Sequence, residues 1–462
     1  MKRRDFLKHA AIGGALGSLA GRVNPGGLVY PAYESSAAGG TKLVFVSDLH
    51  LNADADVSWI NSHLPDLADF FSSIRNRTDV SELVILGDLV DDWVIPTDRT
   101  PSAFEAILDA DQNAEVVQAL QAVCDTSIHV TYVTGNHDLL SFQQDNTATL
   151  NAFFPEMTVV SNEPGLGAYA RDRVLYAEHG HRYDLFNSPD TWSHPGSHLP
   201  LGYFIARSVA TQSARDGRIY TLPDTQRSWM SAVLNAPDLA RSAEGLSALD
   251  SASDERIREI LRELEGPENR APARRPAKRR VYPSDRWDDG FIDDDLIVLI
   301  FRSIALWAGE GPWSRFAMAD EDGFARDPRV RDVAQWYDEI FSQWPDRQNI
   351  VSADMAFWND VDYMGSAADL LFAMPERIKP YYDFTPRIVL FGHTHKPVLQ
   401  FHGVADTIYA NTGTWIDNKP MTWVEVEVPA EDAVDERKYT VSLWYRGDNK
   451  ARYSASIDAP AA

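Results

Sequence analysis

Cysteine is almost absent from this sequence of 462 residues, which contains only Cys124. A single cysteine excludes an intrachain disulfide, and it also excludes a metal site built from several thiolates. The role that we expect for Cys124 is that of a small buried apolar side chain. A metal site in this chain must therefore take most of its ligands from oxygen and imidazole groups.

Positive charge is also scarce. The 43 Lys and Arg residues face 68 Asp and Glu residues, which gives a formal net charge of -25. A surface this acidic repels a phosphate backbone, so we expect no nucleic-acid scaffold role.

Long apolar runs are missing beyond the N-terminus, so we expect no transmembrane span in the mature protein. The N-terminus itself reads MKRRDFLK, followed by a short Gly- and Ala-rich apolar stretch from Ala10 to Ala20. This pattern resembles a twin-arginine export signal. It implies the twin-arginine export machinery as a partner, a periplasmic or extracellular location, and cleavage after Ala20 or near Ala38. The alternative is an ordinary basic tail.

From Thr41 onward, apolar strand-like runs alternate with helix-like segments, which predicts an α/β fold. The expected strands are 42–47, 83–87, 128–134, 174–179 and 387–392, and the expected helices are 64–76 and 103–124. The strand-like runs 407–411, 422–428 and 439–446 have no helices between them and predict a mixed or antiparallel sheet.

The domain organisation follows from these patterns. Residues 1–40 are expected to be signal peptide and linker, and the catalytic domain to span 41–187 and 381–462. Residues 188–380 are expected to form a helical insertion or cap. Its basic, Pro-broken stretch 270–280 is either a solvated linker or a clamp for an anion.

Five apolar runs end in residue types that bind metals. They are VFVSDLH, LVILGD, HVTYVTGNHD, VLYAEHGH and RIVLFGHTH. Asp48 and His50 are two positions apart, so on an extended chain they would share a face. In an open α/β sheet, ligands collect at the carboxyl ends of the strands. Oxygen and imidazole ligands without sulfur favour two divalent cations such as Mn, Fe or Zn.

In this order, the five motifs resemble the calcineurin-like metallophosphoesterase superfamily. The resemblance implies a four-layer β-sandwich flanked by helices, and a two-metal hydrolase of phosphate esters that uses a metal-bound hydroxide. It places Asp48, His50 and His395 on the first metal, Asp88 as the bridge, and Asn136, His179 and His393 on the second metal. His137 becomes the general acid or transition-state stabiliser, and Asp138 orients it. His181, His194 and His198 are left as neighbours of the site or as ordinary loop histidines.

The branch of the superfamily is narrowed by departures from known motifs. Asp91 stands where purple acid phosphatases have Tyr, and Asp92 stands where protein Ser/Thr phosphatases have Arg. The phrases SDLHL and GDLVDDW look most like UDP-2,3-diacylglucosamine pyrophosphatase, a branch that commonly has Arg in place of His137. The general prediction is therefore hydrolysis of a phosphomonoester, phosphodiester or pyrophosphate. A pyrophosphatase of that branch is the alternative, and an inactive phosphate-ligand binding protein is a further one.

Overall fold

The computed structural model describes residues 32–35, 41–96, 99–184, 187–189, 199–200, 384–403, 406–429 and 437–460, together with single residues in 202–219 and 364–372. The expected export signal, His194, His198, the basic stretch 270–280 and most of the expected insertion 188–380 lie outside this part of the chain. Among the described residues, no helix is both long enough and apolar enough to cross a membrane.

The described strands form two sheets. The six-stranded sheet has the order β1 (Tyr33–Glu34), β6 (Tyr169–Arg171), β7 (Leu175–Ala177), β8 (Ile388–Phe391), β10 (Thr407–Asn411) and β9 (Val398–His402). The seven-stranded sheet has the order β13 (Tyr453–Asp458), β12 (Lys438–Tyr445), β11 (Thr422–Glu427), β2 (Lys42–Val46), β3 (Val80–Leu86), β4 (His129–Val133) and β5 (Met157–Val160).

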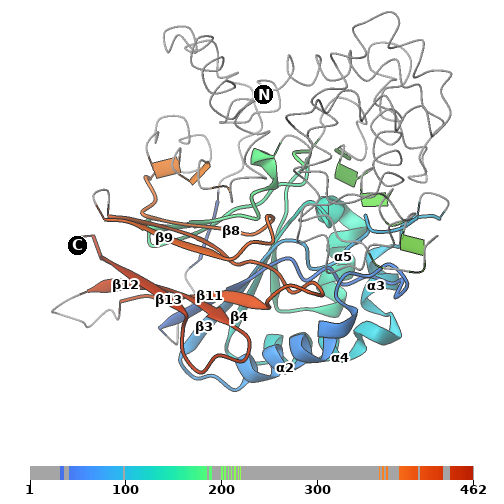
Figure 1. Ribbon diagram of the computed structural model, residues 1–462, viewed down its shortest axis with the longest axis horizontal. Helices are drawn as coiled ribbons and strands as arrows, with labels where there is room; N and C mark the ends of the chain where they lie inside the picture. Colours follow the sequence, from blue (N-terminus) through green and yellow to red (C-terminus); the bar gives the residue numbers. More distant parts are fainter. Residues whose placement is uncertain are drawn as a thin grey trace, which may run out of the picture.

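Two apolar cores hold the layers together, and β2 contributes to both. Its alternate residues Leu43 and Phe45 join the core between the two sheets. Val44 and Val46 join a second core, under the helices α2 (Leu64–Arg75) and α4 (Ala114–Cys124). This alternation is what a strand buried on both faces requires. Figure 1 shows α2 and α4 on one side of the seven-stranded sheet, and β8 and β9 on the other.

The mixed α/β architecture agrees with the predicted class. The described residues show three layers: helices, the seven-stranded sheet and the six-stranded sheet. The antiparallel pairing of β11, β12 and β13 confirms the expected change of pattern at the C-terminal end. Helical residues at 367–368 and 371–372 lie near β9, where the ring of Phe372 is 6.4 Å from the ring of His402. Cys124 is buried at the end of α4, as expected.

The predicted helix 103–124 is interrupted. The chain forms α3 (Phe104–Leu108), the short 3₁₀ turn η2 (Asp111–Asn113) and then α4. At this break, the Asn113 side chain donates hydrogen bonds to the carbonyls of Ile107 (2.7 Å) and of Asn52 in another loop (3.0 Å). A side chain that bonds to the backbone in this way competes with the helical pattern.

The region expected to be linker contains a strand. Tyr33–Glu34 forms β1, which pairs in parallel with β6 at the edge of the six-stranded sheet. The hydroxyl of Ser35 then donates to Oε2 of the buried Glu82 at 2.6 Å. This short stretch is therefore part of the folded body. The helix α5 (Gln144–Phe153), which the sequence patterns did not predict, follows β4.

Candidate metal centre

The five predicted motifs meet at one edge of the two stacked sheets. The strands β2, β3 and β4 are parallel neighbours, and Asp48, Asp88 and Asn136 follow their carboxyl ends. The strands β7 and β8 are parallel neighbours in the other sheet, and His179 and His393 follow them. Parallel strands end on the same side of a sheet, and this brings residues from distant parts of the chain together.

The backbone at this edge is turned into the left-handed region. The φ angles are 56° at Asp48, 50° at His50, 55° at Asp88, 68° at His393 and 56° at His395. Each such non-glycine residue costs about 1–3 kcal/mol and persists only where the surroundings enforce it, typically at functional sites. The strand β2 ends before either Asp48 or His50. Their convergence therefore comes from this turned loop, and the predicted shared strand face is wrong.

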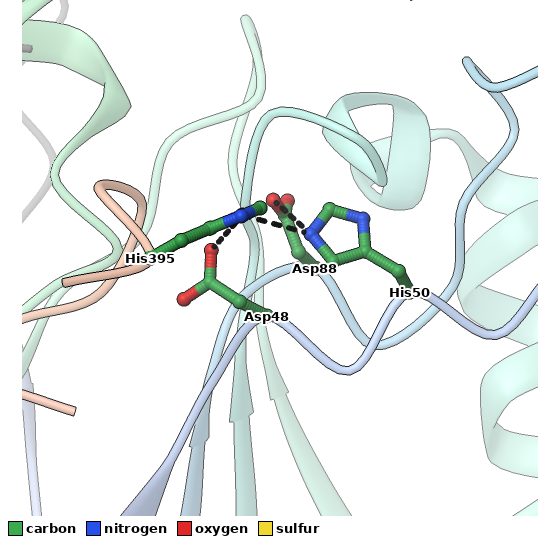
Figure 2. A group of neighbouring side chains, drawn as sticks. All are labelled: Asp48, His50, Asp88 and His395. Carbon is green, nitrogen blue, oxygen red and sulfur yellow. Dashed lines mark hydrogen bonds and ion pairs between the residues drawn. The ribbon is translucent and has the colours of Figure 1, made fainter. Parts of the chain in front are cut away.

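Four buried side chains form the first group: Asp48, His50, Asp88 and His395 (Figure 2). Nε2 of His395 lies 3.1 Å from Oδ1 of Asp48 and 3.1 Å from Nε2 of His50. Oδ2 of Asp88 lies 3.6 Å from Nε2 of His50. The other carboxylate oxygen of Asp48 is held by the Ser47 hydroxyl and by the backbone N–H of His393 (3.1 Å). Oδ1 of Asp48 thus faces the group.

A second group shares Asp88 and adds Asn136, His179 and His393. Oδ1 of Asn136 lies 2.9 Å from Nε2 of His179 and 2.8 Å from Nδ1 of His393. Oδ2 of Asp88 lies 3.3 Å from Nε2 of His179. The structure therefore brings together all seven predicted ligands, with Asp88 between the two groups.

The protonation pattern tests whether a cation fits. Nδ1 of His179 lies 2.7 Å from the carbonyl oxygen of Leu86, which can only accept, so this nitrogen carries the proton. In the neutral ring Nε2 then has a lone pair, and it faces the oxygens of Asn136 and Asp88. His50 repeats the pattern, because its Nδ1 donates to Oδ2 of Asp91 at 2.9 Å. Converging lone pairs need an added proton or a cation, and this donor set fits Mn, Fe or Zn.

His137 sits beside the first group and is oriented by Asp91. Nδ1 of His137 donates to Oδ1 of Asp91 at 2.9 Å, while its backbone N–H donates to Oδ1 of Asp88. The predicted orienting role of Asp138 is wrong. Its two carboxylate oxygens accept backbone N–H groups from Gly135 (2.6 Å) and Leu89 (2.7 Å) and thus hold the loops that carry the ligands.

Comparison with known proteins agrees with this geometry. Residues 41–229 match the family model of the calcineurin-like phosphoesterases. The chain is a metal-dependent phosphoesterase. The match covers less than half of the chain and includes the motifs from Asp48 to His179, while His393 and His395 lie beyond it.

Solved structures that match the phosphoesterase chain have low similarity to it. One is a dimetal phosphatase from Danio rerio, with 12% identity, a TM-score of 0.33 and coverage of 91% of this chain and 99% of that one. Another is a phosphopantetheinyl hydrolase from Mycobacterium tuberculosis, with 10% identity, a TM-score of 0.25 and coverage of 82% and 91%. No curated protein matches this phosphoesterase.

The charges in the phosphoesterase site depend on one another. Burial would raise the pKa of Asp88, but the imidazoles of His179 and His137 hold it well below its usual range. Burial would lower the pKa of His179, but the carboxylates of Asp88 and Asp48 raise it to about 9. The pKa of His137 is raised for the same reason, by Asp91 and Asp88. A cation bound at Nε2 of His179 would displace the proton that this ring holds, so metal binding would release a proton.

The glycines of the phosphoesterase motifs are required by close approach. A Cβ atom on Gly135 would clash with Oδ1 of Asp88, and one on Gly392 would clash with the Ser47 hydroxyl and lie 2.8 Å from Oδ2 of Asp48. These contacts explain why glycine precedes Asn136 and His393.

His181 does not join the ligands. Its Nε2 donates to the carbonyl of Gly165 at 2.8 Å, and burial lowers its pKa well below the usual range. The chain turns between the two histidines, because Gly180 has a φ of 108°. The ring of His181 lies 5.5 Å from the ring of His179, and its Nε2 is already used by Gly165. This supports the preference for His179 as the ligand.

Sequence reasoning missed several residues of the phosphoesterase site. Asp184 and Asn187 bond to the second group, and the rings of Trp59 and Trp93 lie 5.4 Å and 4.8 Å from His137. In the sequence, Asp91 is distinguished only as a departure from the Tyr of purple acid phosphatases. The one available signal was position, since Asp91 and Asp184 follow ligands by three and five residues.

Proposed function

We propose that this chain hydrolyses phosphate esters, namely a phosphomonoester, a phosphodiester or a pyrophosphate, with two divalent cations held at the candidate centre. The observation that carries the proposal is the convergence of lone pairs from His179, Asn136 and Asp88, which only a cation or extra protons can balance. Asp48, His50 and His395 would hold one cation, and Asn136, His179 and His393 the other. Asp88 would be shared between them.

Two such cations supply Lewis acidity toward phosphate oxygens and a nucleophile at neutral pH. The protein residues then position the other reacting groups. Asp91 accepts the Nδ1 proton of His137, which leaves Nε2 as the atom that can deliver a proton to the leaving oxygen. Because the same Asp91 also accepts from His50, one carboxylate aligns the proton donor with the first metal site. This pairing supports turnover over the inactive-binder alternative.

The test is metal analysis together with turnover of nitrophenyl phosphate mono- and diesters. We expect the purified wild-type chain to hold two Mn²⁺, Fe²⁺ or Zn²⁺ ions and to hydrolyse at least one ester. Asp88→Asn removes the charge shared by both cations and should lower both occupancy and rate. Asp448→Asn is the matched control, because the partly exposed carboxylate of Asp448 pairs with Arg452 instead of a candidate ligand, and it should change neither. Two metals and normal turnover in Asp88→Asn would refute the shared role of Asp88.

We also propose export by the twin-arginine route, on the strength of the RRDFLK sequence that contains Arg3 and Arg4. The strand β1 supports cleavage after Ala20 over cleavage near Ala38, since the later cut would remove Tyr33 and Ser35 from the six-stranded sheet and from Glu82.

A further inference from the structure

A closed ring of polar side-chain contacts borders the second group of candidate ligands. Asp184 is fully buried after the 3₁₀ turn η4 (His181–Tyr183), and its Oδ2 lies 3.0 Å from Nε2 of His393. Nδ2 of Asn187 donates to the same oxygen. Oδ1 of Asn187 accepts a hydrogen bond from Nδ2 of Asn136 at 3.4 Å. Oδ1 of Asn136 lies 2.8 Å from Nδ1 of His393, which closes the ring.

The carboxylate of Asp184 determines which nitrogen of His393 carries the proton. A carboxylate can only accept, so Nε2 of His393 carries the proton when it bonds to Asp184. In the neutral imidazole, Nδ1 then has a lone pair, and Nδ1 is the atom that faces Asn136. Asp184 therefore selects the tautomer in which His393 can bind a cation together with Asn136.

The carboxylate of Asp184 also determines the amide orientations of Asn187 and Asn136. Asn187 must turn its amide nitrogen toward Asp184, which leaves its oxygen facing Asn136. Asn136 in turn must offer its nitrogen to Asn187 and keep its oxygen toward His393 and His179. The negative charge of Asp184 thus sets the polarity of the ring in both directions.

We propose that Asp184 and Asn187 are positioning residues of the second metal site. They fix the tautomer of His393 and the amide orientation of Asn136, so that both lone pairs point at one cation. The proposal rests on the proposed two-metal function. Each metal site would then have one carboxylate that holds a ligand histidine in place: Asp184 for His393, and Asp91 for His50. Outer hydrogen-bond partners of this kind are typically worth about 10–100-fold in metal affinity.

The experiment titrates Mn²⁺ into the metal-stripped full-length protein against a competing fluorescent chelator, which resolves the two binding steps. Asp184→Asn should weaken one of the two binding steps about 10–100-fold and leave the other step unchanged. Asn187→Ala removes a half-buried side chain and should weaken the same step with a smaller effect. Asp91→Asn should instead weaken the step that Asp184→Asn leaves unchanged.

The matched control is Glu178→Gln. This carboxyl group is buried in the same loop, but it accepts from Arg182 (2.6 Å) and Tyr176 (2.9 Å), outside the ring. Its loss should lower the melting temperature without changing the ratio of the two Mn²⁺ affinities. A merely structural role for Asp184 would make Asp184→Asn behave like this control.

A second measurement does not depend on metal. Nitrogen-15 NMR of the metal-free protein should show His393 protonated at Nε2, and Asp184→Asn should populate the other tautomer. If Asp184→Asn leaves both Mn²⁺ affinities and the His393 tautomer unchanged, the proposal is overturned. If Asp184→Asn does not fold, Asn187→Ala decides by the same two readouts. A wild-type chain that binds fewer than two Mn²⁺ ions would overturn the proposed function instead. The tautomer measurement would still test whether Asp184 orients His393.

Discussion

At the scale of single residues, the proposed function assigns cation binding to one set of side chains and proton transfer to His137. It is held at Nδ1 by Asp91, and the indole ring of Trp93 lies 4.8 Å from it at an interplanar angle of 32°. The contact of His137 with Asp88 is made by its backbone N–H, so that contact does not depend on the imidazole.

We therefore expect His137→Ala to keep both metals and to lose rate according to the leaving group. General acid catalysis is typically worth about 10²–10⁴-fold, so hydrolysis of an alkyl ester should fall by that order. A nitrophenyl ester, whose leaving group hardly needs a proton, should lose much less. Metal analysis and turnover of both esters measure the difference.

His393→Ala is the comparison for this prediction. It removes a candidate ligand, so metal content and both ester rates should fall together. Equal slowing of both esters in His137→Ala, or loss of metal, would assign His137 to metal binding or to substrate positioning.

At the scale of elements, the two-residue strand β1 brings the chain to a buried polar group in the core. The strand β1 adds only Tyr33–Glu34 to the six-stranded sheet, but the next residue, Ser35, supplies a hydrogen bond to the buried carboxyl group of Glu82 on β3. Tyr169 and Thr131 donate to the same carboxyl group, so Glu82 joins both sheets. An element of two residues therefore helps to satisfy a polar group in the core.

We expect Ser35→Ala to lower the free energy of unfolding by about 1–3 kcal/mol, the cost of leaving a buried acceptor with fewer donors. Urea denaturation followed by circular dichroism measures this change. Ser456→Ala is the control, because Ser456 is exposed and pairs with Thr440, and it should stay within about 0.5 kcal/mol of wild type. Equal stability of the two variants would show that the Ser35–Glu82 hydrogen bond contributes little to stability.

At the scale of the whole molecule, the fold does not depend on disulfides, because its single cysteine is buried at the end of α4. Burial raises the pKa of the Cys124 thiol to about 12, so the folded chain holds it as an unreactive thiol. A chain that folds and loads metal without oxidation suits export in the folded state.

We expect the joint change of Arg3 and Arg4 to Lys to keep the protein inside the cell. Cell fractionation with detection of the full-length and processed forms measures this, and Arg22→Lys is the control outside the motif. The export proposal fails if the double variant reaches the exterior as efficiently as the control does.

The sequence by itself determined the α/β class, most of the strands that lead to the site, and the candidate ligands. These signals are local: apolar runs of strand length stop at Asp, Asn or His, and glycine stands where another backbone or carboxylate approaches closely. Local propensity also predicted α2 correctly, but it missed the break between α3 and α4, because that break depends on a side chain reaching the carbonyl of Asn52 in another loop.

Only the tertiary structure decided which residues support the ligands. Asp91 replaced Asp138 as the partner of His137, and Asp184 and Asn187 emerged as neighbours of the second group. Such roles depend on the direction of a side chain after a turned backbone, and on partners as far as 209 residues away along the chain, as for Asp184 and His393. A linear pattern contains the types of these residues but not the distances that join them.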